Sequence, residues 1–162
     1  MTGDEVDEVV TAWARERDDL ALEPMHIWSR IDRLAGILAG HRKRAFSAHA
    51  IEGWEFDVLA ALRRAGEPYR LSPGQLLRET HVTSGTMTNR VDRLVARGAV
   101  TRDPDPYDGR GMLVTLTAAG LELVDAALLS LLMLEEALLA EWDPHDRAKM
   151  TDYLRRLLIG SV

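Results

Sequence analysis

Apolar residues recur at helical spacing through most of this chain, so the pattern predicts a mainly α-helical fold. The predicted helices cover residues 4–17, 23–48, 52–65, 73–79, 84–98, 118–142 and 144–158. Two short extended runs, 99–103 and 112–116, flank a connection rich in Pro, Gly and Asp. Two strands around such a connection are typical of a β-hairpin.

The segment 72–98 has unusually clear helix boundaries. Ser72 is a candidate N-cap, Pro73 occupies the first helical position, and Gln75 completes a capping box. A short helix, a break at 80–82 and a second helix together describe a helix-turn-helix, and the hairpin that follows makes it winged. We therefore predict a mainly α fold with a small β-hairpin wing, a winged helix-turn-helix.

The second helix of this motif has an apolar face formed by Met87, Val91, Leu94 and Val95, and small polar groups on the opposite side. Such a helix suits the major groove of DNA, because Thr and Asn can bond base edges and glycine permits close approach. An arginine at a hairpin tip can reach the minor groove. The residues expected to contact double-stranded DNA are Ser72, Ser84, Gly85, Thr86, Thr88, Asn89, Arg93 and Arg110. The alternatives are a solvated helix face and an ordinary charged turn.

Over residues 121–141 the predicted helix 118–142 is apolar nearly all round, and such a helix must be buried on most sides. A second copy of the chain would supply the cover, so we expect a two-fold homodimer. The alternative is burial within the monomer by the first, second and last helices. The expected organisation is one compact fold with an extra N-terminal helix, a dimerisation helix, the winged region and C-terminal dimerisation helices, at residues 1–22, 23–50, 51–117 and 118–162.

The net charge of −6 is unevenly distributed. Residues 41–110 carry 12 Lys or Arg and 9 Asp or Glu, whereas the rest of the chain carries 8 and 17. DNA binding needs a basic face and not a basic total. The overall negative charge also fits a rival function, a winged-helix module that binds proteins without binding specific DNA.

Other features narrow the class of protein. The chain has no cysteine, and its histidines show no metal-ligand spacing, so neither a metal nor a cofactor is expected. No nucleophile and base pairing or phosphate-binding glycine loop is present, so an enzyme is not expected. The most apolar stretch is about nine residues, against roughly 20 for a membrane span. With no signal peptide at the N-terminus, a cytoplasmic protein without membrane contact is expected.

The sequence resembles the MarR family of bacterial transcription regulators from about residue 23 to residue 158. The resemblance is carried by the segment 54–59, the helix-turn-helix 71–98, and a wing with Asp108 and Arg110 that leads into Leu116-Thr117-x-x-Gly120. The family pattern often has a second arginine where Gly109 stands. The resemblance implies a dimer whose two recognition helices enter successive major grooves.

The extra N-terminal helix narrows the resemblance to the PecS and HucR branch, whose members often respond to urate. The ligand residues implied by that branch match Trp13, Asp57, Arg90 and Arg102 in type. The resemblance therefore implies a ligand-responsive repressor that is released from DNA by a small anionic aromatic ligand such as urate.

The pattern of apolar residues also indicates an inward position for three of these side chains, Asp57, Arg90 and Arg102. Asp57 lies along an apolar stripe, three residues after Trp54 and beside Val58 and Ala61, where a carboxylate needs a partner. Arg90 flanks the buried face of its helix, and Arg102 shares a strand face with Val100. Two inward arginines near one inward carboxylate can bind an anion. They can equally form a structural salt-bridge network.

Overall fold

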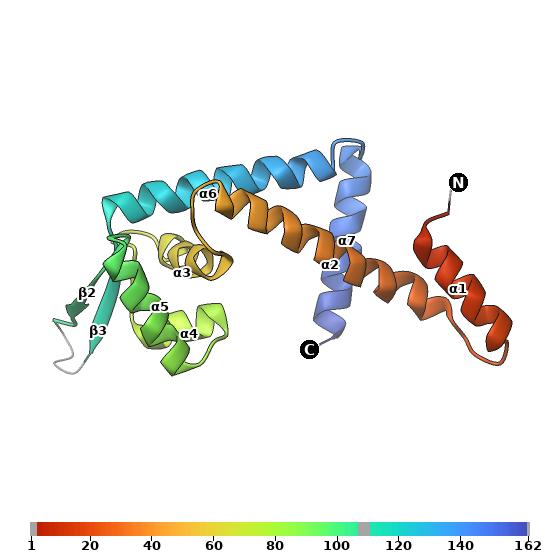
Figure 1. Cartoon of the computed structure of the whole chain (residues 1–162), viewed down its shortest axis with the longest axis horizontal. Helices are drawn as coiled ribbons and strands as arrows, with labels where there is room; N and C mark the ends of the chain where they lie inside the picture. Colours follow the sequence, from red (N-terminus) through yellow and green to blue (C-terminus); the bar gives the residue numbers. More distant parts are fainter. Residues whose placement is uncertain (1–2, 107–110, 162) are drawn as a thin grey trace. The chain divides into compact units, whose positions relative to one another are not determined.

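The computed structural model describes residues 3–106 and 111–161, which fold as two compact units, Met1–Arg42 and Lys43–Val162. The elements, labelled in Figure 1, are α1 (Glu5–Glu16), α2 (Glu23–Ser47), α3 (Gly53–Arg64), β1 (Arg70–Leu71), α4 (Pro73–Thr80), α5 (Ser84–Ala96), β2 (Val100–Pro104), β3 (Met112–Leu116), α6 (Ala118–Leu138) and α7 (Pro144–Gly160). All seven predicted helices and both predicted strands are present. The mainly helical winged fold is thereby confirmed.

The first unit holds the extra helix α1 and most of α2. Asp4 caps α1 by accepting from the backbone N–H groups of Val6 (2.9 Å) and Asp7 (3.2 Å). Arg30 of α2 donates to the carboxylates of Asp4 (2.8 Å) and Asp7 (2.7 Å). The Arg30 guanidinium holds the pKa of Asp4 below its usual range. One arginine thus ties the start of α1 to α2.

The core of the second unit forms around α3. Phe46, in the last turn of α2, stacks on Phe56 of α3 with ring centroids 4.4 Å apart. Val58, Leu59 and Leu62 of α3 are completely buried. Helices α4, α5 and α6 and strand β3 all contact α3, so this short helix connects the helix-turn-helix to the C-terminal half.

The predicted helix-turn-helix is confirmed in detail. Ser72 caps α4 reciprocally with Gln75, at 3.3 Å and 2.8 Å. Helix α4 ends at Thr80, and its C-cap His81 has left-handed backbone angles (φ 52°). The C-terminus of α5 has a Schellman motif, in which Gly98 adopts φ 75° and the N–H of Ala99 donates to the carbonyl of Leu94 (3.0 Å).

The buried face of α5 differs from the sequence prediction at one position. Met87, Val91 and Leu94 are at most 2% exposed, whereas Val95 is 40% exposed. Val95 is one residue, or about 100°, further round the helix than Leu94, which turns it away from the core. The buried stripe of α5 is therefore narrower than predicted.

The sheet has three antiparallel strands in the order β1-β3-β2, one more strand than predicted. Val100 pairs with Leu116 and Pro104 with Met112, which forms the predicted hairpin. Strand β1 pairs Leu71 with Val114. A strand of two residues is too short to show an alternating pattern, so β1 could not be predicted from periodicity.

The start of α6 is locked onto the start of β2. The Thr117 hydroxyl donates to the carbonyl of Gly98 (2.7 Å) and accepts from the N–H of Gly120 (3.0 Å). A Cβ at position 120 would lie 1.9 Å from the carbonyl oxygen of Ala99. Only glycine allows this close approach of helix and strand.

The C-terminal helices expose much of their apolar surface. Helix α6 ends at Leu138, earlier than predicted, and buries Val124, Ala127 and Leu131. The large apolar side chains left exposed on these helices are Leu128, Leu129, Leu132, Met133, Leu138, Met150, Tyr153, Leu154, Leu158 and Ile159. Within residues 3–106 and 111–161, no helix has the length and apolar character needed to cross a membrane.

Replacing Gly120 with Ala should destabilise the protein by about 3 kcal/mol or more, because the added methyl meets backbone that cannot move aside. Thermal unfolding would measure the loss. Gly36→Ala is a matched control, since it lies inside α2 with open space around it and should stabilise the helix by about 0.5–1 kcal/mol. A Gly120→Ala protein that melts with the parent would contradict this account of the junction.

Candidate DNA-binding surface

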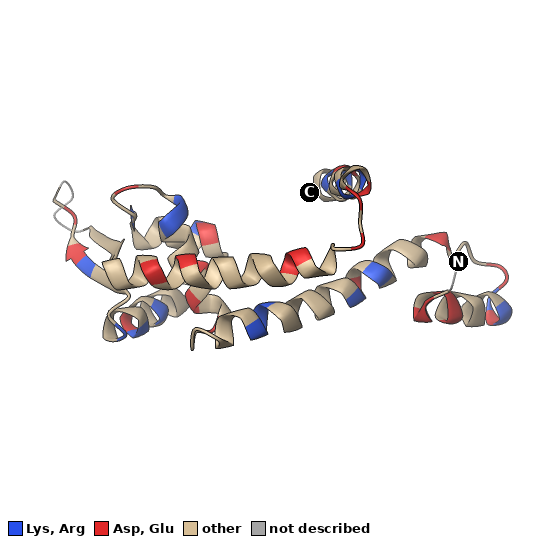
Figure 2. Ribbon diagram, turned by 90° about the horizontal axis from the view of Figure 1, so that it is seen from above, with Lys and Arg blue, Asp and Glu red and all other residues tan. Residues whose placement is uncertain are grey.

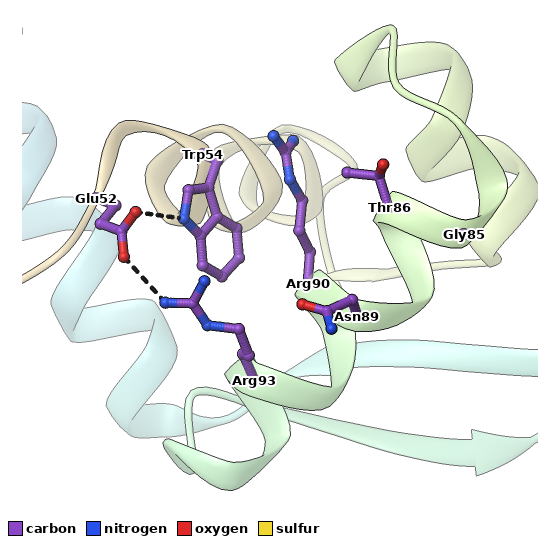
Figure 3. Close-up of a pocket in the computed structure, with 7 residues that line it drawn as sticks. All are labelled: Glu52, Trp54, Gly85, Thr86, Asn89, Arg90 and Arg93. Carbon is purple, nitrogen blue, oxygen red and sulfur yellow. Dashed lines mark hydrogen bonds and ion pairs between the residues drawn. The ribbon is translucent and has the colours of Figure 1, made fainter.

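The exposed side of α5 forms one wall of an open pocket (Figure 3). Gly85, Thr86, Asn89, Arg90 and Arg93 line it from α5, and residues at the start of α3 line it opposite. Four of these five α5 residues were predicted to contact DNA. Helix α5 thus brings Gly85, Thr86, Asn89 and Arg93 together, while its apolar side holds it against the core.

Three predicted DNA contacts also have roles within the fold. Ser72 caps α4, and the Thr88 hydroxyl donates to the carbonyl of Ser84 (3.2 Å). Ser84 and Thr88 are exposed, and Ser72 is half-buried. The predicted wing contact Arg110 lies outside the described residues.

Helices α5 and α6 carry different charges. Helix α6 carries Asp and Glu but no Lys or Arg, whereas α5 carries two arginines and one aspartate and is followed by Arg97 at its C-cap; Figure 2 shows the charges by colour. Phosphates attract arginine and repel carboxylates, so α5 and not α6 suits a nucleic-acid surface.

The start of α3 presents two side chains to the arginines of α5. The guanidinium carbons of Arg93 and Arg90 lie over the Trp54 indole ring, 4.6 Å and 5.5 Å from the ring centroid. Glu52 accepts from the indole N–H of Trp54 (2.9 Å) and from Arg93 (2.9 Å), the bonds dashed in Figure 3. Trp54 lies in the segment 54–59 that carries the family resemblance, whereas no pattern in the sequence indicated a role for Glu52.

The inward carboxylate of α3 is Glu55 and not Asp57. Glu55 is 5% exposed and bonds to Arg97 (3.3 Å), while Asp57 is exposed. Arg97 also donates to the carbonyl of Ala50 (2.8 Å). The expectation of an inward Asp57 was wrong because α3 turns its residues by about 100° each, so side chains two apart face nearly opposite directions.

The other predicted ligand residues have separate surroundings. Arg102 forms an ion pair with Asp92 (3.1 Å), and Arg90 lies against Trp54. Trp13 belongs to the first unit and is about half exposed. The Arg102–Asp92 pair is a salt bridge, although with a different aspartate from the one the sequence suggested.

Comparison with known proteins supports the same assignment. A sequence model described as the MarR family matches residues 51–111. The HTH-type transcriptional regulator PecS of Dickeya dadantii is 31% identical over 158 residues, which cover 98% of this chain and 92% of that protein. The multiple antibiotic resistance protein MarR of Escherichia coli is 41% identical over 66 residues, 41% of this chain and 44% of that protein.

Solved structures show the same fold. A mutant MarR from Escherichia coli complexed with operator DNA superposes with a TM-score of 0.70 at 26% identity, covering 85% of this chain and 96% of that one. BpsR of Bordetella bronchiseptica, whose DNA binding is regulated by 6-hydroxynicotinic acid, superposes with a TM-score of 0.67 at 24% identity, covering 81% and 91%. The winged helix-turn-helix, its exposed recognition helix and the similarity to PecS over nearly the whole chain show that this protein belongs to the MarR family of DNA-binding transcriptional regulators.

Proposed function

We propose that this protein is a ligand-responsive repressor that binds a pseudo-palindromic operator as a homodimer. The observation that carries the proposal is the orientation of α5. Its apolar face is buried, and Gly85, Thr86, Asn89 and Arg93 remain together on the accessible side. Such a surface matches the donor and acceptor pattern of the major groove.

The exposed apolar surface of the terminal helices supports the homodimer. None of the residues of α7, all of which the structure describes, is buried, and Leu129, Met133, Leu158 and Ile159 are each more than 60% exposed. Monomeric proteins rarely expose large apolar patches. A two-fold partner that covers them would also present two copies of α5 to one duplex, so the operator should have two half-sites about one helical turn apart.

The proposed ligand is a small planar anion, with urate as the suggestion of the PecS and HucR resemblance. Arg90 belongs to the recognition helix and Arg102 to the first wing strand, so an anion bound by either arginine acts on an element that reads DNA. Charge-assisted hydrogen bonds from arginine supply affinity, and the resemblance adds Trp13 as a stacking surface. Asp57 would repel the anion, and that repulsion is the proposed drive for the release of DNA.

Arg93→Ala should weaken operator binding by about 1–3 kcal/mol if Arg93 contacts a base edge. Arg110→Ala should lower the slope of log K against log salt by about one if Arg110 neutralises a phosphate. Mobility-shift titrations against DNA upstream of the protein's own gene would measure both. Arg64→Ala, which removes an exposed arginine of α3 paired with Glu79, is the control. If the parent protein binds this upstream DNA no tighter than random DNA, the proposal is contradicted and a protein-interaction module is favoured.

Gly85→Ala should leave the fold intact, because the added methyl meets nothing within 4 Å in the free protein. DNA binding should nevertheless weaken by about 1–3 kcal/mol, since the methyl occupies space that a base pair needs. Thermal unfolding and anisotropy titration with a labelled duplex would separate the two effects. Unchanged affinity would show that this turn of α5 does not approach the bases.

Arg90→Ala and Arg102→Ala should each weaken urate binding, by about 1.5–3 kcal/mol for a charged hydrogen bond. Asp57→Asn should bind urate but fail to release DNA, and Trp13→Phe should weaken binding modestly. Isothermal calorimetry with urate, with Arg64→Ala as a charge control, would test this. If Arg102→Ala binds urate as tightly as the parent, Arg102 serves only its salt bridge with Asp92.

A further inference from the structure

Two arginines of α5 and the arginine at its C-cap face the first turn of α3. Arg90, Arg93 and Arg97 follow one another at spacings of three and four residues, which places them along one side of the helix. Arg90 lies over Trp54, Arg93 over Trp54 and against Glu52, and Arg97 against Glu55. Among these arginines, Arg93 is the one that the proposed function assigns to base contact.

The position of Glu52 is fixed from two directions. Its backbone N–H donates to the Glu55 carboxylate (2.7 Å), and Glu55 is itself buried against Arg97. Its side chain uses both oxygens, one for the indole N–H of Trp54 and the other for Arg93. The indole N–H first, and then Arg93, lower the pKa of Glu52, so the carboxylate is charged at neutral pH.

Arg93 is held but remains accessible. Its guanidinium stacks on the Trp54 ring and bonds to Glu52, while 55% of its side chain stays exposed. Figure 3 shows Arg93 between Trp54 and its own helix, on the same helix as Asn89 and Thr86. A free arginine samples many rotamers and binds any phosphate, whereas a preorganised one loses less freedom when it docks in one geometry.

We infer that Glu52 and Trp54 are positioning residues that make Arg93 selective for a base edge over the phosphate backbone. Trp54 fixes the plane of the guanidinium, and Glu52 fixes its direction. While Arg93 is held by Glu52, it is not free to turn toward the phosphate backbone, so the pair disfavours the non-specific arrangement more than the specific one. The inference rests on the proposed function, because it gives this pair a role only if α5 discriminates between DNA sequences.

The test compares Kd for two labelled duplexes, one enriched from a randomised library by the parent protein and one with the same bases scrambled. Glu52→Gln keeps the size of the side chain and an oxygen for the Trp54 indole, but it cannot form the ion pair with Arg93. The ratio of the two Kd values should fall about tenfold, the discrimination of one good base contact. Scrambled DNA should bind more tightly, with a salt slope steeper by about one as Arg93 becomes free to contact a phosphate.

Two controls separate positioning from general charge. Glu79→Gln removes an exposed carboxylate paired with Arg64 on the neighbouring helix and should leave the ratio unchanged. In an Arg93→Ala background, Glu52→Gln should have no further effect on the ratio, because its action runs through Arg93. Circular dichroism of each variant would confirm the fold.

Different results overturn different statements. A parent that discriminates, with a Glu52→Gln ratio within twofold of it, overturns the positioning role alone. The same is true if Glu79→Gln lowers the ratio equally, or if Glu52→Gln still lowers it without Arg93. A parent that binds enriched and scrambled duplexes equally overturns the proposed function and the positioning role together.

Discussion

The DNA-binding surface proposed on α5 depends on one constraint, the burial of a narrow apolar face on the other side of the helix. Met87, Val91 and Leu94 are in effect fully buried, and at about 100° per residue they span only about 60° of the helix. Their burial fixes the rotation of α5 about its axis. The arginines at 90, 93 and 97 then fall about 70–130° away from this stripe, at the border with the polar side. The packing of α5 against the core thus determines which of its side chains are exposed to solvent.

The second constraint is the junction formed by Gly98, Ala99, Thr117 and Gly120. Gly98 ends the recognition helix, Ala99 leads into the first wing strand, and Thr117 and Gly120 start α6. All three elements meet within a few hydrogen bonds, and Gly120 leaves no room for them to slide. Gly120 thus holds the start of α6 against the residues that join the recognition helix to the first wing strand.

The sequence predicted what local chemistry determines. The capping box of Ser72 and Gln75 is a short-range signal, and the structure confirms it. Two features depended on tertiary contacts and were missed. Strand β1 exists only because β3 offers it a partner, and the pairing of Glu52 with Arg93 joins residues 41 apart. The buried acid of α3 is Glu55, whereas Asp57 was expected. Apolar neighbours in the sequence therefore do not suffice to predict which carboxylate is buried.

The acidic charge of the chain is compatible with DNA binding because of how its carboxylates are distributed. Charges in solvent are screened beyond a Debye length of about 8 Å at physiological salt, so α6, which carries acidic residues alone, acts weakly on a duplex bound elsewhere. Glu52 lies beside α5 and Asp92 lies on it, and they are paired with Arg93 and Arg102, respectively. Paired carboxylates contribute little net repulsion at a distance, but they restrain the arginine they hold. The acidic residues on and beside the recognition helix α5 therefore orient their partner arginines, and they weaken the electrostatic attraction of DNA only slightly.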